Sequence, residues 1–145
     1  MRAVIQRVKK TTLTVDGKLV SEIGGGLAVY LGVGCGDTPE KADVIAKKIV
    51  NLRVFEDENG KMNLSVLQAG GEILLISQFT LYGDCSRGNR PSFTQAAPPS
   101  LAEPVYLLTA EKLRGYGVSV RTGVFGADMK IEQYNDGPVT IVYEC

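Results

Sequence analysis

The sequence predicts a single α/β domain spanning residues 1–145, and three observations support this. The chain has 145 residues, 44% of them hydrophobic, which is the size of one domain with its own core. Apolar and polar residues alternate in a strand-like manner before Val33. Two segments with helical spacing, at about 38–52 and 100–114, are separated and followed by further strand patterns. No linker, repeat or low-complexity tract divides the chain.

The first 33 residues predict a meander of about four strands. Their apolar residues recur mostly at every second position, as expected for strands with one buried face. Asp16-Gly17 suits the positive φ angles of a tight hairpin turn, and Gly24-Gly25-Gly26 suits a second reversal. The pattern therefore favours neighbouring strands that pair antiparallel.

A helix is predicted to follow this meander. Thr38 and Pro39 suit an N-cap and a first helical position, and apolar residues then recur at helical spacing. Charged residues fall largely on the opposite side, so we expect the helix to cover one face of the sheet. Short strands are predicted next, at 53–56 and 72–77.

The second helix is predicted from about 100 to 114. Ser100 and Glu103 have the spacing of a capping box, although Pro104 lies near the first turn. Gly115 ends the helical pattern. The remaining residues predict strands at 118–122 and at about 129–144.

Composition excludes several classes of chemistry. Histidine is absent, which rules out Ser-His and Cys-His nucleophile pairs, a His-ligated zinc and a His general base. Lys plus Arg and Asp plus Glu both number 16, so a nucleic-acid substrate would be held by a local basic patch. Cys35, Cys85 and Cys145 fit neither a disulfide framework nor a Cys-x-x-Cys metal site. The lack of a signal-peptide or membrane-span pattern predicts a cytoplasmic protein.

Ser77, Gln78, Phe79 and Thr80 directly follow the apolar strand predicted at 72–77. Backbone amides at the end of such a strand can point outward and stabilise an oxyanion. Alternatively, the two hydroxyls satisfy local backbone groups and Phe79 fills the core. Thr80 as a nucleophile would need a base, and without histidine only a carboxylate, a lysine or the substrate remains.

Gly137-Pro138 interrupts the strand predicted at about 129–144. Proline removes a ladder hydrogen bond, so it is expected at an edge, a bulge or a turn. Because most X-Pro bonds are trans, the residues alone favour a trans turn between two strands. A cis bond would let both carbonyls point the same way, grip an ammonium group and reject a substituent of the wrong hand by collision.

Together, the runs Ser77-Gln78-Phe79-Thr80-Leu81-Tyr82-Gly83-Asp84 and Asn135-Asp136-Gly137-Pro138-Val139-Thr140 resemble the D-aminoacyl-tRNA deacylase family. The similarity covers essentially the full length, in order. It also includes the segments 1–8, 53–58, 60–63, 90–93 and 125–129. Gly83 stands where alanine is common, and the ending Val142–Cys145 is atypical, but neither departure touches a matched site position.

The resemblance implies a homodimer whose small α/β subunits have a barrel-like mixed β-sheet and two main helices. It implies that Ser77, Gln78, Phe79 and Thr80 form the catalytic pocket for the scissile ester and the terminal adenosine. Substrate binding is implied for a second group, in which Met129 borders the pocket and Arg7 helps to fix Gly137 and Pro138. The Gly137-Pro138 bond is then cis and enters the partner's site.

The resemblance also implies hydrolysis of the ester between a D-amino acid and tRNA, or of glycine mischarged on tRNA-Ala, without metal or cofactor. L-amino acids are rejected by exclusion. Either the tRNA 2′-hydroxyl with backbone donors or Thr80 as nucleophile carries the chemistry. Two alternatives are a non-catalytic module that binds RNA ends, and a related editor that removes a small L-amino acid through a trans Gly-Pro.

Overall fold

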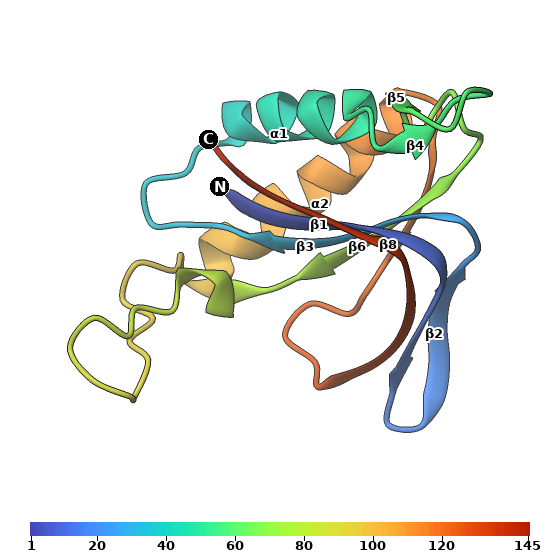
Figure 1. Ribbon diagram of the computed structural model, residues 1–145. Coiled ribbons are helices and arrows are strands. Elements are labelled where there is room, and N and C mark those ends of the chain that lie inside the picture. Colours follow the sequence, from blue (N-terminus) through green and yellow to red (C-terminus); the bar gives the residue numbers. More distant parts are fainter.

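The computed structural model describes all 145 residues as a strongly bent six-stranded sheet, a small two-stranded sheet and two helices (Figure 1). The strands of the main sheet and the helices confirm the predicted α/β class. The elements in chain order are β1 Arg2–Val15, β2 Lys18–Ile23, β3 Gly26–Gly32, α1 Pro39–Asn51, β4 Phe55–Glu56, β5 Met62–Leu64, β6 Glu72–Ser77, the 3₁₀ turn η1 Phe79–Tyr82, α2 Pro99–Gly115, β7 Ser119–Thr122 and β8 Met129–Glu144.

β1 organises the main sheet. Its first half pairs antiparallel with β3, and its second half pairs antiparallel with β2. β8 runs antiparallel along the other edge of β1, from Arg2 opposite Glu144 to Val15 opposite Met129. β6 and β7 then extend the sheet from β3 in parallel. The sheet is therefore mixed and curls towards a barrel, as the resemblance implies.

The number of N-terminal strands differs from the prediction. β1 continues without a break from Arg2 to Val15, so the meander has three strands where about four were expected. The register explains this continuity, because β1 leaves β3 at Val8 and joins β2 at Thr11 while β8 accompanies both halves. The hairpin at Asp16-Gly17 is as predicted, with φ angles of 50° and 75°.

The core lies on both faces of the sheet. Both helices pack on one face over a cluster of 23 buried residues, and Tyr106 is among its largest buried side chains. A smaller cluster of six buried residues, including Leu74 and Ile76, lies on the other face. β6 is buried on both sides, which is typical of a parallel strand between two layers. Neither α1 nor α2 combines the length and the apolar character that a membrane-spanning helix requires.

The two helices compare differently with their predictions. α1 begins at Pro39 with Thr38 as N-cap, as expected. α2 begins at Pro99, so the capping box predicted at Ser100 is wrong. Pro99 takes the first helical position, for which the fixed φ of proline is suited, and this moves Ser100 inside the first turn.

Candidate active site

A cavity of about 590 Å³ opens where β6 ends, beside η1, the first turns of α2 and the segment 125–129. Most of its lining is apolar, and four aromatic rings contribute to it: Phe79, Phe93, Tyr106 and Phe125. Pockets of this size and character bind small molecules. The site predicted after β6 therefore coincides with a concave surface.

Four of the predicted site residues line this cavity: Ser77, Gln78, Phe79 and Met129. Phe79 is 57% exposed, so it does not fill the core. Its ring instead packs edge-on against Phe93, with the centroids 5.1 Å apart. The alternative explanation of Phe79 as a core residue is thereby wrong, and its side chain stands at the mouth of the cavity.

The rear of the cavity is held by Tyr106. Its hydroxyl donates a hydrogen bond of 2.8 Å to the carbonyl of Leu75, which ties α2 to β6. Burial raises the pKa of Tyr106 to about 12, so the hydroxyl keeps its proton and its role as donor at all ordinary pH values. Phe93 and Phe125 belong to runs that carried the resemblance, but the sequence assigned neither a role.

Thr80 lies beside the cavity, outside its lining. Its hydroxyl accepts a hydrogen bond from the side-chain amide of Gln78, and no ionisable side chain bonds to it. Phe79 and Thr80 are the first residues of η1, so their backbone amides have no hydrogen-bond acceptor within that turn. Neither amide donates a backbone hydrogen bond to a neighbouring turn or loop. Gln78, by contrast, donates its amide to the carbonyl of Leu31 at 2.8 Å. Two backbone donors thus remain free beside the cavity, an arrangement that can stabilise a developing oxyanion.

A second cluster surrounds Arg7, which is 6% exposed. Its Nη1 donates to the carbonyl of Val54 at 2.7 Å, and its Nε donates to the carbonyl of Asp136 at 3.3 Å. The carboxylates of Asp136 and Glu56 lie 3.3 and 3.7 Å from its guanidinium nitrogens. Arg7 therefore joins β1, the start of β4 and β8 at one point.

The Gly137-Pro138 segment forms a bulge of β8 at this cluster. Gln6 pairs with Thr140 and Val8 pairs with Asn135, so residues 136–139 lie opposite Arg7 alone. The Gly137-Pro138 bond is cis and Gly137 has a φ of 121°. The trans turn that the residues alone favour is therefore wrong. Both residues are exposed.

The structure thus divides the predicted residues between two places. Ser77, Gln78, Phe79 and Met129 line the cavity with Thr80 beside them, whereas Arg7 and Gly137-Pro138 belong to the β8 bulge and contribute nothing to the lining. Within one subunit the two groups do not form a single site.

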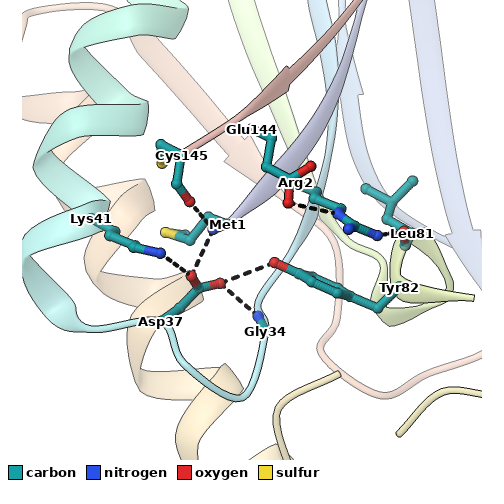
Figure 2. Close-up of polar contacts among 9 residues, drawn as sticks. All are labelled: Met1, Arg2, Gly34, Asp37, Lys41, Leu81, Tyr82, Glu144 and Cys145. Atoms are coloured by element: carbon teal, nitrogen blue, oxygen red, sulfur yellow. Dashed lines mark hydrogen bonds and ion pairs between the residues drawn. The ribbon is translucent and has the colours of Figure 1, made fainter. Parts of the chain in front are cut away.

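A polar network that the sequence did not indicate lies behind η1 (Figure 2). Asp37 Oδ1 accepts hydrogen bonds from the Met1 amine at 2.7 Å and from Lys41 at 2.8 Å. Its Oδ2 accepts from the Gly34 amide at 2.6 Å and from the Tyr82 hydroxyl at 3.1 Å. Burial would raise the pKa of Asp37, but the bonds from Lys41, the amine and Gly34 outweigh it and lower the pKa to about 2.

Comparisons with known proteins bear on this arrangement. Residues 4–144 match the model of the family described as D-Tyr-tRNA(Tyr) deacylase. A protein of Fervidobacterium nodosum named D-aminoacyl-tRNA deacylase is 54% identical over 99% of this chain and 97% of that protein. One of the same name from Geobacillus sp. (strain WCH70) is 56% identical over 99% and 95% of the two chains.

Two solved structures are similar throughout. One, of a protein named c-Myc DNA Unwinding Element Binding Protein, has a TM-score of 0.94 and 44% identity, and the match covers 100% of this chain and 99% of that chain. The other, described as a probable eukaryotic D-amino acid tRNA deacylase, has a TM-score of 0.85 over 98% of this chain and 97% of that chain. At 18% identity, the second similarity shows the fold alone. The family match and the curated relatives confirm the resemblance found in the sequence, and the chain belongs to the D-Tyr-tRNA(Tyr) deacylase family of hydrolases.

Proposed function

We propose that this protein hydrolyses the ester bond that joins a D-amino acid to the terminal ribose of tRNA, and that it also accepts glycine mischarged on tRNA-Ala. The products are the free amino acid and free tRNA, and the place of action is the cytoplasm, where aminoacyl-tRNA is made and used. The observation that carries the proposal is the cavity at the end of β6, with Ser77, Gln78 and Phe79 in its lining. The names of the curated relatives agree with it.

The proposed reaction uses backbone groups at the cavity mouth. Water attacks the ester carbonyl carbon, the bond to the ribose oxygen breaks, and that oxygen leaves as a hydroxyl after gaining a proton. The free amides of Phe79 and Thr80 donate to the oxyanion that forms on the carbonyl oxygen. The terminal base enters the aromatic part of the cavity, where base–ring stacking favours binding.

The proton transfer is assigned to the substrate. Thr80 has no basic partner, because only the Gln78 amide bonds to its hydroxyl. A threonine without a base is a weak nucleophile at neutral pH. We therefore favour the tRNA 2′-hydroxyl, next to the ester, as the group that helps water to attack.

The chirality filter is assigned to Gly137-Pro138 of a second copy of the chain in a homodimer. The segment is exposed and held by Arg7, yet it contributes nothing to the cavity of its own subunit. A bulge of this kind can reach the cavity of a partner. There its two carbonyls would grip the substrate ammonium and leave no space for an L side chain.

The test is deacylation of matched D-tyrosyl-tRNA and L-tyrosyl-tRNA by the purified protein in the presence of a chelator. We expect rapid loss of the D ester alone. Loss of both esters would contradict the filter assigned to Gly137-Pro138. Loss of neither would contradict the hydrolase activity itself.

A second candidate is a protein that binds nucleic-acid ends without turnover. The solved structure that is 44% identical to this chain is of a protein named for DNA binding, which favours this candidate. Saturable binding of uncharged tRNA or single-stranded DNA with no hydrolysis of either ester would support it. Hydrolysis of the D ester at catalytic protein concentration would contradict it.

A further inference from the structure

Tyr82 ends the 3₁₀ turn that carries two of the candidate catalytic residues, Phe79 and Thr80. It is almost fully buried, and its side chain fills a niche beside β3 that only glycine leaves open. A Cβ on Gly34 would lie 2.7 Å from the Tyr82 hydroxyl, and one on Gly32 would lie 3.2 Å from its ring. The position of η1 therefore depends on how this ring sits against β3.

The hydroxyl of Tyr82 donates a hydrogen bond of 3.1 Å to Oδ2 of Asp37 (Figure 2). Asp37 is itself fixed by donors from the loop after β3, from α1 and from the start of β1, namely Gly34, Lys41 and Met1. A carboxylate held by four donors cannot move without losing several of these bonds. The hydrogen bond from Tyr82 thus tethers η1 to a carboxylate that is itself fixed by the sheet and by α1.

Arg2 adds a second tether on the same side of η1. Its Nη1 donates to the carbonyl of Leu81 at 3.2 Å, and its guanidinium lies over the Tyr82 ring at 4.5 Å from the centroid. An ion pair of 3.1 Å with Glu144 keeps Arg2 in this position. The cavity lining includes none of these three residues, Arg2, Asp37 and Tyr82.

We propose that Asp37 and Tyr82 are positioning residues, which hold η1 so that the amides of Phe79 and Thr80 keep their position beside the cavity. They touch no reacting atom. The activity readout of this inference rests on the proposed function. A shift of about 1 Å in donors of this kind is enough to slow a reaction by up to about a hundredfold.

The first test is Tyr82→Phe, which keeps the buried ring and removes only the hydroxyl that meets Asp37. We expect kcat for D-tyrosyl-tRNA to fall about tenfold with KM changed less than about threefold, because Phe79 is the only residue of η1 in the cavity lining and the other walls are left unchanged. Amide hydrogen exchange over residues 78–83 is expected to become faster in the same variant, since η1 loses its tether.

Two control variants separate positioning from general loss of stability. Tyr116→Phe removes a hydroxyl from a tyrosine that is 42% exposed at the end of α2. Ile49→Val removes one methyl group from the core of α1. We expect both controls to keep the wild-type kcat and the wild-type exchange of residues 78–83. A kcat loss in Ile49→Val equal to that in Tyr82→Phe would overturn the inference.

Asp37→Asn tests the same contact at the acceptor. It replaces one carboxylate oxygen, which accepts hydrogen bonds, with an amide group that donates them to a site where all four partners are donors. Because both substitutions weaken the Tyr82–Asp37 contact, Tyr82→Phe is expected to cost little further kcat in the Asp37→Asn background. Fully additive losses would contradict the shared contact. If Asp37→Asn does not fold, the kcat and the hydrogen exchange of Tyr82→Phe alone test the positioning role.

The outcome also separates this inference from the proposed function. An active wild type with an unchanged kcat in Tyr82→Phe would overturn the positioning role and leave the hydrolase standing. An inactive wild type would contradict the proposed hydrolase activity. The positioning inference would then be tested by hydrogen exchange alone. Faster exchange confined to residues 78–83 in Tyr82→Phe would support the tether, and unchanged exchange would refute it.

Discussion

Arg7 is a buried cation that holds three backbone segments together. Its planar guanidinium donates to two carbonyls, those of Val54 and Asp136, and faces two carboxylates. A lysine has a single nitrogen and cannot meet these partners at once. The shape of the β8 bulge at Gly137-Pro138 therefore depends on this one side chain.

Arg7→Ala is expected to lower the rate of D-ester hydrolysis by at least about tenfold and the free energy of unfolding by about 2 kcal/mol. The reason is that two carbonyls and two carboxylates lose their shared partner. Thermal unfolding and kcat/KM for D-tyrosyl-tRNA measure the two effects. Lys9→Ala is the control, because Lys9 is exposed and only approaches Asp136 at 3.8 Å. Unchanged D-ester turnover in Arg7→Ala would remove Arg7 from the proposed filter.

Thr80→Ala is expected to retain activity within about tenfold of the wild type. The hydroxyl contacts only the Gln78 amide, whereas the Thr80 backbone amide survives the substitution. Single-turnover hydrolysis of D-tyrosyl-tRNA measures the chemical step directly. Complete loss of activity in a folded Thr80→Ala protein would instead assign the hydroxyl a direct role in the reaction.

Asp37 is expected to make stability sensitive to acid. Its pKa is about 2 in the folded protein against 3.8 as the usual value, so the unfolded chain binds the proton more tightly. The carboxylate then contributes about 2 kcal/mol above pH 5, and this contribution is lost as pH falls through the folded pKa. Urea unfolding from pH 6 to pH 2 measures it. Asp37→Asn should show a flatter dependence, while Asp43→Asn, on the exposed face of α1, should follow the wild type.

These residues show where sequence reasoning stops at the scale of single side chains. The run 77–80 follows a recognisable strand, so its position at the end of that strand was predictable, whereas the pocket that Ser77, Gln78 and Phe79 line was implied only by the resemblance. Arg7 meets partners 47 and 129 positions away, and Asp37 meets Tyr82 45 positions away. No local pattern encodes such contacts. Only the resemblance pointed to Arg7, and nothing pointed to Asp37.

At the scale of elements, the pairing of β3 with β6 depends on one glycine. A Cβ on Gly26 would lie 1.9 Å from the carbonyl oxygen of Glu72 and 2.7 Å from its nitrogen. Both atoms are backbone, so no side-chain rotation relieves the contact. The two parallel strands, and with them the end of β6 at the cavity, need a residue without a side chain here.

Gly26→Ala is accordingly expected to lower the free energy of unfolding by about 3 kcal/mol or more, since overpacking against backbone forces the strands apart. Gly25→Ala is a matched control one residue away, where an added Cβ meets nothing within 4 Å. It should change stability by less than about 0.5 kcal/mol. Chemical denaturation of the two variants gives the comparison, and equal stabilities would refute the close approach of β3 and β6.

Most elements were predictable because their signals are local. The Asp16-Gly17 hairpin, the start of α1 at Pro39 and the apolar run of β6 all carry their own patterns. The misses depend on tertiary context. β1 has no break because β8 accompanies it throughout, and α2 begins at Pro99 although Ser100 and Glu103 have capping-box spacing.

For the whole molecule, the separation of the cavity from Gly137-Pro138 makes dimerisation part of the proposed mechanism. We expect light scattering to give twice the chain mass of 15.6 kDa. A monomer that is fully active on D-tyrosyl-tRNA would contradict the action of Gly137-Pro138 in a second copy.

Mixing two defective variants tests this arrangement more sharply. Arg7→Ala impairs the bulge, and Ala102→Trp fills the cavity with an indole from α2. After subunit exchange, about half of the dimers are mixed, and each has one site with an intact bulge and an intact cavity. We expect the mixture to recover about a quarter of wild-type activity. No recovery, despite exchange seen by mass spectrometry of tagged subunits, would place the bulge in the same subunit's reaction.

The pairing of β1 with β8 has a consequence for how the chain is made. β1 is translated first, yet its longest partner strand begins at Met129. Until the ribosome releases the C-terminal segment, one edge of β1 lacks its partner from Arg2 to Val15. Open edges of this kind attract other chains. The nascent protein therefore passes through a stage in which the unpaired edge of its first strand is open to pairing with other chains.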